Sequence, residues 1–346
     1  MQNAKHNGKV LVTGAGGYIG TTLVPLLLES GYEVRVIDRF FFGRELLNSN
    51  GQLEIIQEDA RRVNASHLDG IDYVIDLVAI SNDPSGELFG DETFAINQYA
   101  RIRIAELAKQ AGVKRYILPS SCSIYGFQDP GVIATEQTKT NPLTTYARAN
   151  EAAEHGVLAL ASDDFVVVVL RQATVYGFSP RMRFDLAING MAYGAWKTGV
   201  LPLMRDGTQW RPMIHVKDTA RAQIFMLTAD PTKVNGQIFN VGSDKNNYQL
   251  GPLAEIVAKT VERDVKIEWY GAPDHRSYRV GFDKIEALGY NAKLTAVDGV
   301  RDTCQALQAG LIDRTPKTIT LDWYKELISW QERMRQVEMY GGILRI

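Results

Sequence analysis

The sequence predicts an α/β fold: a Rossmann-like, doubly wound parallel sheet followed by a smaller, mixed C-terminal domain. Short apolar segments, such as residues 73–78 and 165–170, alternate with amphipathic segments long enough to form helices. A glycine-rich turn at residues 14–20 separates the first expected strand from the first expected helix. After about residue 177 this alternation gives way to shorter segments interrupted by Gly and Pro. This pattern is typical of a dinucleotide-binding domain with a second domain over the carboxyl ends of its strands.

The elements of the first domain follow one another along the chain. We expect strands at residues 10–12, 33–37, 55–56, 73–78, 115–119 and 165–170, with helices to about residue 30, at 91–110 and at 143–161. Continuous apolar strands indicate a parallel sheet buried on both faces, with right-handed crossovers. Residues 1–177 form the expected dinucleotide-binding domain, to which segments near 212–245 return. Residues 178–346 form mainly the substrate domain and a C-terminal helix at about 321–337.

Composition excludes several classes of protein. The 346 residues carry a net charge of −2 without a long basic run, which is not the pattern of a nucleic-acid binder. The apolar stretches are too short to span a membrane, and the polar residues 1–9 do not form a signal peptide. Two distant cysteines, Cys122 and Cys304, indicate a reducing compartment, and we expect a cytoplasmic protein. We expect no metal, because no Cys, His or carboxylate spacing suggests a metal site.

The glycine-rich turn predicts a dinucleotide site. Gly14 permits a tight turn, and Gly17 lets the backbone approach a pyrophosphate at the positive end of the helix. Gly20 lets that helix pack closely on the sheet, and Tyr18 and Ile19 complete the turn as cofactor contacts.

Acidic residues at the strand ends indicate which dinucleotide binds. Asp38 lies 18 residues beyond Gly20, where a carboxylate accepts hydrogen bonds from the adenosine ribose and repels a 2′-phosphate. The sequence therefore predicts NAD rather than NADP, although the neighbouring Arg39 could help a 2′-phosphate bind. Asp59 is placed to touch the adenine. The remaining expected cofactor contacts beside these strand ends are Arg39, Ala60, Leu77 and Ala79.

Several motifs together resemble the extended short-chain dehydrogenases/reductases. Residues 13–20 have the Thr-Gly-x-x-Gly-x-x-Gly form of that family, and residues 120–126 (SSCSIYG) are similar to its active-site strand end. Residues 146–150 (YARAN) resemble its Tyr-x-x-x-Lys motif. Residues 171–177 and 211–218 resemble later segments of nucleotide-sugar epimerases and dehydratases, and residues 179–186 are similar to a subgroup that includes enzymes acting on GDP-heptoses.

The resemblance implies the catalytic residues. In the family the tyrosine, here Tyr146, accepts the proton of a sugar hydroxyl, and a Ser or Thr, here Ser121, hydrogen-bonds the same oxygen. Hydride then moves between the sugar carbon and the nicotinamide. A phenol has a pKa of about 10, and the family lysine normally helps the tyrosine to act as a base.

Asn150 stands where the family lysine is expected. Asn150 can hydrogen-bond a ribose hydroxyl of the cofactor, but it carries no charge. Three explanations are open: another cation, such as Arg148 or a loop lysine, substitutes; the enzyme works with a less activated tyrosine; or the protein is catalytically impaired. If Asn150 limits activation of Tyr146, replacing it by lysine should raise turnover or lower the pH optimum.

Cys122 and Ser123 occupy the two positions at which family dehydratases typically have Asp-Glu. Because these carboxyl groups carry out the proton transfers of elimination, ordinary 4,6-dehydration is disfavoured. Cys122 is a candidate acid or base next to a ketone, and the alternative is a small buried residue that packs the strand end.

The leading hypothesis is an NAD-dependent nucleotide-sugar epimerase that works through a transient keto sugar, with a homodimer as the expected assembly. A nucleotide-sugar 4-dehydrogenase or reductase is the second hypothesis. A catalytically impaired protein that binds NAD or a nucleotide sugar is the third. The expected substrate contacts are Ser81, Asn82, Arg183, Arg211 and Arg276, since arginine binds a pyrophosphate through paired hydrogen bonds.

Overall fold

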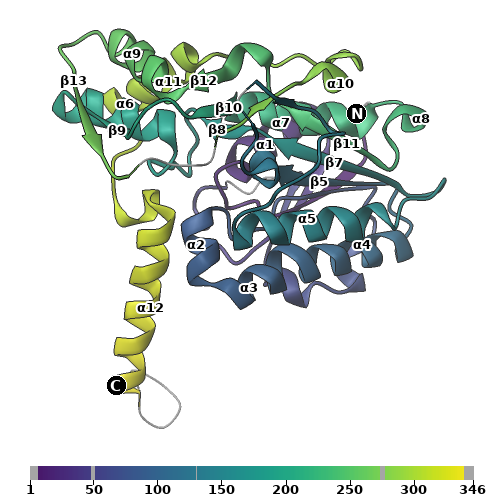
Figure 1. Cartoon of the computed structure of the whole chain (residues 1–346). Coiled ribbons are helices and arrows are strands. Elements are labelled where there is room, and N and C mark those ends of the chain that lie inside the picture. The colour runs from purple at the N-terminus through teal and green to yellow at the C-terminus, as the bar shows by residue number, and fades with distance from the viewer. Residues whose placement is uncertain (1–6, 48–50, 130, 273–276, 339–346) are drawn as a thin grey trace, which may run out of the picture.

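A seven-stranded parallel sheet forms the centre of the computed structural model, which describes residues 7–47, 51–129, 131–272 and 277–338 (Figure 1). The predicted Rossmann-like α/β fold is confirmed. Most of the polar segment 1–9 lies outside the described residues. In spatial order the strands are β11 (Gln237–Val241), β7 (Val166–Gln172), β5 (Arg115–Ser121), β4 (Tyr73–Asp76), β1 (Lys9–Thr13), β2 (Glu33–Asp38) and β3 (Leu53–Gln57).

The strand order reverses between β1 and β4. From β1 the chain proceeds outward to β2 and β3, and it then returns to place β4 on the other side of β1. Such a reversal leaves a crevice at the carboxyl ends of the two central strands, where open α/β sheets bind their ligands.

Helices cover both faces of the sheet, which explains why its central strands are mostly apolar. Helices α1 (Gly20–Glu29) and α7 (Val216–Thr228) pack on one face, and α4 (Arg101–Gln110) and α5 (Thr145–Leu158) pack on the other (Figure 1). Successive residues of a strand point to opposite faces. In β1, Val10 and Val12 accordingly join the core under α1, whereas Leu11 joins the core under α4.

The helix expected at 91–110 is three consecutive segments. Helix α3 (Gly90–Phe94) is followed by a π-helical segment, η3 (Ala95–Ala100), and then by α4. A π segment is wider than an α-helix and is frequent at functional sites. Here it carries the buried Asn97, whose side chain accepts a hydrogen bond from the Ile80 backbone N–H and donates one to the Ile80 carbonyl. The π segment thus holds the loop that follows β4.

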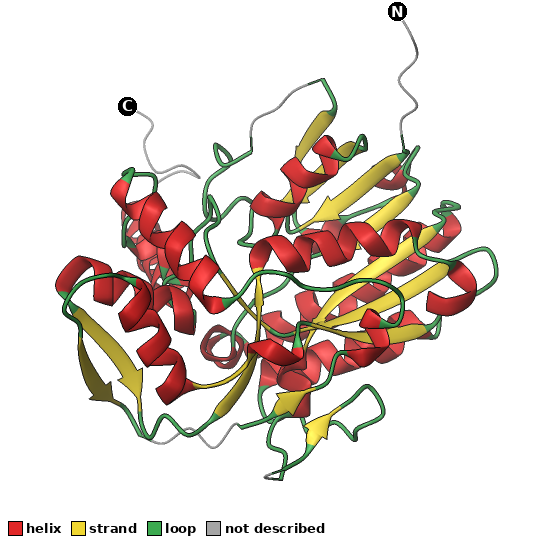
Figure 2. Ribbon diagram, turned by 90° about the horizontal axis from the view of Figure 1, so that it is seen from above, coloured by secondary structure: helices red, strands yellow, loops and turns green. Residues whose placement is uncertain are grey.

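The second half of the chain builds a smaller mixed layer beside the parallel sheet (Figure 2). Strand β10 pairs in parallel with β8 and antiparallel to β12, and β9 pairs with β13. The longer elements of this layer are β8 (Thr174–Tyr176), α6 (Ala187–Thr198), β9 (Val200–Met204), β10 (Trp210–His215), β12 (Asn247–Gln249), α9 (Leu250–Thr260), β13 (Lys266–Tyr270) and α11 (Ala296–Gln308).

Short elements connect these layers. The short strands and helices are β6 (Ile133–Ala134), β14 (Arg279–Val280), α2 (Asp83–Leu88), α8 (Pro231–Val234), α10 (Asp283–Glu286), η1 (Ala60–Arg62), η2 (Ala65–Leu68), η4 (Cys122–Tyr125), η5 (Asp244–Asn246) and η6 (Pro316–Thr318). Within the range 212–245, α7 packs on α1 and β11 pairs with β7, so this part of the chain completes the parallel-sheet layers.

The C-terminal helix α12 (Thr320–Val337) packs against the body by its first turns and then projects away from it (Figure 1). The Trp323 indole N–H donates to the carbonyl of Phe41 at 2.6 Å, and the Tyr324 ring contacts Phe42 and Phe89. Farther along, Trp330 is exposed. In the described part of the chain, no helix combines the length and apolar character needed to span a bilayer.

A buried ion pair ties α5 to the strands beside it. The Arg171 guanidinium on β7 donates to the Glu154 carboxylate, with Nη2 2.7 Å from Oε2, and Glu154 is fully buried. Ser120 on β5 also donates to Glu154, while Arg171 Nη1 donates to the Tyr125 hydroxyl at 3.1 Å. This network fixes the end of β5, one residue before Ser121.

We predict that Glu154→Ala destabilises the protein by about 3–5 kcal/mol, because it leaves the Arg171 charge buried without its partner. Chemical denaturation followed by circular dichroism measures the effect. The matched control is Glu106→Ala on α4, where the side chain is exposed and a change within about 0.5 kcal/mol is expected. Equal effects of the two substitutions would contradict this account.

Candidate active site

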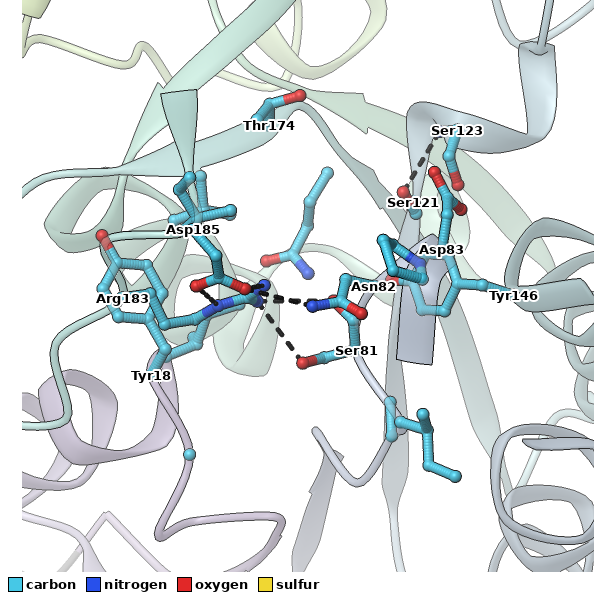
Figure 3. Close-up of a pocket in the computed structure, with 18 of the residues that line it drawn as sticks. Tyr18, Ser81, Asn82, Asp83, Ser121, Ser123, Tyr146, Thr174, Arg183 and Asp185 are labelled. Carbon is cyan, nitrogen blue, oxygen red and sulfur yellow. Dashed lines mark hydrogen bonds and ion pairs between the residues drawn. The ribbon is translucent and has the colours of Figure 1, made fainter. Parts of the chain in front are cut away.

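One cavity of about 860 Å³ opens at the carboxyl edge of the parallel sheet and continues toward the smaller layer (Figure 3). Both halves of the chain line it, from the glycine-rich turn to Met204 on β9 and Tyr270 on β13. The structure brings most of the predicted site residues to this cavity. They are Gly14, Gly17, Tyr18, Ile19, Gly20, Asp38, Arg39, Asp59, Ala60, Leu77, Ala79, Ser81, Asn82, Ser121, Tyr146, Arg183 and Arg211.

Two glycines make the turn between β1 and α1 possible. Gly14 has a φ of +66°, and a Cβ atom there would lie 2.7 Å from the Leu77 carbonyl carbon. At Gly20 a Cβ atom would lie 2.5 Å from the Ala15 Cα atom. Only glycine therefore lets the turn approach β4 and lets α1 begin against it. The N-terminal end of α1 faces the cavity, where it favours an anionic group.

Asp38 ends β2 with its carboxylate at the cavity. It accepts hydrogen bonds from the backbone N–H groups of Gly16, at 3.0 Å, and Phe40. Burial raises the pKa of Asp38 above its usual range, and these two hydrogen bonds and the charges of Arg181 and Arg39 oppose that rise. The carboxylate is thus held at the position from which an aspartate receives the ribose hydroxyls of NAD.

Arg39 and Asp59 contact each other beside Asp38. The Arg39 guanidinium donates to Asp59 at 3.3 Å, and Arg61 donates to the same carboxylate at 2.7 Å. The Arg61 hydrogen bond is the main cause of the lowered pKa of Asp59. Because Arg39 already has a carboxylate partner, it is less available to a 2′-phosphate than the sequence alone suggested.

These features fit NAD. The backbone cradle that a Cβ atom would fill at Gly14 and Gly20, the positive helix end and the Asp38 carboxylate are what a pyrophosphate and an adenosine ribose require. Ala60, Leu77 and Ala79 line the adjoining wall.

Tyr146 and Ser121 both line the cavity (Figure 3), and their side chains are hydrogen-bonded to each other. Tyr146 is in the first turn of α5, which Thr144 caps by accepting from the Ala147 N–H at 3.1 Å. Burial raises the pKa of the Tyr146 phenol, and nearby Asp83 adds to the rise. Arg101, a hydrogen bond with Ser121, and Arg183 lower it. The phenol therefore stays protonated unless positive charge assists it.

Two of the predicted catalytic residues lie outside the cavity lining. Asn150 is buried: its amide donates to the Tyr146 carbonyl at 2.9 Å, and its oxygen accepts from Arg101 at 2.9 Å. Cys122 is buried as well, and its thiol donates to the Arg171 carbonyl. Burial raises the pKa of the Cys122 thiol far above its usual range, which favours the packing interpretation of this residue.

Ser81, Asn82 and Arg183 form one cluster with Asp185 (Figure 3). The Arg183 guanidinium binds the Asp185 carboxylate through two hydrogen bonds, of 3.1 and 2.7 Å. It also donates to the carbonyl and hydroxyl of Ser81, and the Asn82 amide donates to Asp185 at 3.1 Å. The cluster links the loop after β4 to the segment after β8, directly across the cavity from Tyr146. Arg183 thus lines the cavity as part of an ion pair.

Arg211 on β10 lies at the far end of the cavity, with its guanidinium 5.8 Å from the centre of the Tyr278 ring. Its Nη1 atom donates to the Trp210 carbonyl. The predicted contact Arg276 lies outside the described residues.

Sequence reasoning missed several residues at or beside this site, among them Arg101, which is buried next to Asn150, and the lining residues Asp185 and Tyr324. A signal was present for Arg101, because it lies at helical spacing with Ile104 and Ala108, on the face of α4 that packs into the core. A charged residue on a buried helix face is unusual and indicates a specific role. Asp185 lies only two residues after Arg183, but the sequence pattern did not indicate that their side chains pair, and Tyr324 comes from the distant helix α12.

Comparison with known proteins identifies the family. Residues 10–242 match the model of the NAD dependent epimerase/dehydratase family. UDP-arabinose 4-epimerase 1 of Arabidopsis thaliana is 29% identical over 299 residues, covering 75% of this chain and 69% of the relative. UDP-glucuronate 4-epimerase of Thermodesulfobacterium geofontis is 26% identical over 281 residues, covering 76% and 83%. The solved structure of MoeE5 in complex with UDP-glucose and NAD is similar, with a TM-score of 0.77 and 29% identity. The match covers 88% of this chain and 100% of that chain.

The chain belongs to the NAD dependent epimerase/dehydratase family, whose model covers most of its length. The resemblance drawn from the sequence motifs is thereby confirmed, and so is NAD as the cofactor.

We predict that Asp38→Asn weakens NAD⁺ binding about tenfold, because the ribose hydroxyls lose a charged acceptor. The ratio of NADP⁺ to NAD⁺ affinity should rise, since the charge that repels a 2′-phosphate is removed. Isothermal titration calorimetry with both dinucleotides measures the two effects. The exposed Asp163→Asn is the matched control and should bind like the parent protein. An unchanged preference in Asp38→Asn would exclude Asp38 as the ribose acceptor.

Proposed function

We propose that this protein epimerises a nucleoside-diphosphate sugar at C4, through a transient 4-keto sugar. The observation that carries the proposal is the position of Tyr146 and Ser121, at the junction between the cofactor and substrate parts of one continuous cavity. A sugar bound there can present one hydroxyl to both side chains. The relatives named above are 4-epimerases of UDP sugars, which supports this reaction and this carbon.

The chain supplies the proton chemistry of this reaction. Tyr146, as the tyrosinate, takes the proton from the sugar 4-hydroxyl on Oη, and the Ser121 hydroxyl holds the same oxygen. Bound NAD⁺, held by the glycine turn and Asp38, would supply reversible hydride exchange with either face of C4. Tyr146 returns the proton to the sugar oxygen, and because the hydride also returns to C4 there is no net oxidation. The cluster of Ser81, Asn82, Arg183 and Asp185 orients the sugar from the other side of the cavity.

Positions 122 and 123 support epimerisation over 4,6-dehydration. Cys122 is buried away from the cavity, and Ser123 is a hydroxyl, so neither supplies a carboxyl group for elimination. The far part of the cavity suits the nucleotide: its lining there includes Met204, Tyr270 and Arg211, which offer apolar contact for a base and charge for a diphosphate. The GDP-heptose resemblance stays a prediction, because this lining does not select one base.

Incubation of the purified protein with UDP-, GDP-, CDP- and dTDP-sugars, followed by chromatography and absorbance at 340 nm, tests the proposal. We expect a C4 epimer without net NADH formation, and Tyr146→Phe should lower turnover by about 10²–10⁴-fold because it removes the phenolic base. The exposed Tyr99→Phe is the control and should turn over normally. Stoichiometric NADH would instead identify a dehydrogenase, and ligand binding without product would identify a non-catalytic binding protein.

We further propose that the protein is a cytoplasmic homodimer. The cytoplasmic location is supported by two free cysteines, Cys122 and Cys304, in a chain that builds its core without a disulfide. For the interface we propose the layer of η3, α4 and α5, where Tyr99 is 63% exposed.

Light scattering after size-exclusion chromatography should give twice the mass of the chain. Tyr99→Arg should shift it to one chain mass, because it places charge in the proposed interface, whereas Trp330→Arg on α12 should leave it unchanged. Dissociation by Trp330→Arg alone would move the interface to α12.

A further inference from the structure

Arg101 is fully buried at the point where β4, β5 and α5 meet. It is the first residue of α4 after the π segment, and its side chain is 1% exposed. One Nη atom donates to the Asn150 side-chain oxygen at 2.9 Å. The other donates to the main-chain carbonyls of Asp76 and Pro119, at 2.8 and 2.5 Å. The guanidinium therefore lies beneath the carboxyl ends of two strands, on the cofactor side of the fold.

The hydrogen-bond acceptors that hold Arg101 are neutral. They are one side-chain amide and two carbonyls, and Nε has no hydrogen-bond partner in the described part of the chain. Two of the other buried arginines contact a carboxylate directly, since Arg171 binds Glu154 and Arg183 binds Asp185. Arg115 and Arg181 are buried on neutral acceptors, as Arg101 is, but neither of them hydrogen-bonds to α5, the helix that carries Tyr146. A buried cation without such a contact is costly, and its field extends to neighbouring groups instead of being cancelled at once.

The charged and titratable groups around Arg101 are Asp76, Tyr116 and Tyr146. The Asp76 carboxylate accepts hydrogen bonds from the hydroxyls of Thr13 and Tyr116. Tyr116 is so deeply buried that its pKa is raised well above its usual range, and Arg101 opposes that rise. At Tyr146, Arg101 is the largest influence that lowers the pKa. The other groups that face Tyr146 are Ser121, Asp83 and Arg183.

Asn150 connects this cation to the catalytic helix. It lies one helical turn after Tyr146, accepts from Arg101 and donates to the Tyr146 carbonyl. A lysine at position 150 would place a second cation against the Arg101 guanidinium. The neutral Asn150 therefore accommodates the cation at position 101, which a lysine at position 150 would repel.

We propose that Arg101, held by Asn150, supplies the positive charge that activates Tyr146 in place of the absent lysine. Arg101 does not touch the sugar. It is a positioning residue that acts through Tyr146, and this inference rests on the proposed function. Of the explanations open for Asn150, a substituting cation is the one adopted, but the cation comes from α4. Arg148, the candidate on α5, is exposed and donates to the Leu143 carbonyl and the Thr145 hydroxyl.

Moving the charge tests the proposal directly. Arg101→Met should lower kcat about 10²-fold at neutral pH. It should also shift the acidic limb of the kcat–pH profile upward by about one pH unit or more, because loss of the cation raises the Tyr146 pKa. Arg101→Met combined with Asn150→Lys should recover at least tenfold of the loss and return the limb toward its original pH. Asn150→Lys alone should lower both the melting temperature and kcat, because two cations then share one buried site.

Arg148→Met is the matched control, with the same charge removed from the helix that carries Tyr146, and its profile should equal that of the parent protein. Arg101→Lys keeps the charge and should keep the pH profile even if its packing is poorer. Should Arg101→Met fail to fold, the double variant and Arg101→Lys, which each keep one cation at this site, are compared with the parent protein, and a pH profile that differs from the parent's in both would contradict the proposal.

A second readout does not depend on sugar turnover. Because the charge of NAD⁺ favours tyrosinate, NAD⁺ binding should release protons, measured by calorimetry in buffers of different ionisation enthalpy. The pH at which release is half-maximal should rise in Arg101→Met, and the release should disappear in Tyr146→Phe. If no sugar is turned over but this shift is present, the proposed reaction fails while the role of Arg101 stands.

Two results would overturn the inference. One is a double variant that stays as slow as Arg101→Met with an unrestored pH profile. The other is an Arg101→Met variant whose profile and proton release match the parent protein while only its melting temperature falls. Either result would make Arg101 a purely structural support for the ends of β4 and β5.

Discussion

The parallel arrangement of the sheet is the constraint on which the rest of this structure depends. Because all seven strands run the same way, their carboxyl ends and the loops that follow them gather at one edge. The turn after β1, Asp38 at the end of β2, the Ser81 loop after β4 and Ser121 at the end of β5 are thereby brought to one cavity. The glycines of the first turn make this approach possible, since any side chain at Gly14 would collide with the backbone that follows β4.

Three buried arginines near this edge have different partners and therefore different roles. Arg171 is neutralised by Glu154 and stabilises the junction of α5 with β5 and β7. Arg183 is neutralised by Asp185 and joins the two sides of the cavity. Arg101 contacts only neutral acceptors, so its charge remains available to the groups around it. Among these three arginines, the two that meet a carboxylate hold neighbouring elements together, whereas the charge of Arg101 is left to act on the groups around it.

The π segment before α4 helps to position both a loop of the cavity and Arg101. It carries Asn97, which holds the Ile80 backbone, and it ends at the residue before Arg101. One local widening of a helix therefore supports both the loop that lines the cavity and the cation beneath it. Its backbone geometry is specified by packing against α5 and η1, which a sequence pattern does not display.

The fold class, the dinucleotide turn, NAD as the cofactor and the candidate pair of Tyr146 and Ser121 could all be predicted from the sequence. These follow from short-range patterns: strand and helix periodicity, glycine spacing and a motif one helical turn long. The folded chain was needed to show how Arg183 meets Asp185, that Cys122 lies outside the cavity lining, and that Arg101 is the cation that contacts Asn150. Arg101 lies 49 residues from Asn150, and such contacts depend on how helices pack, not on spacing along the chain.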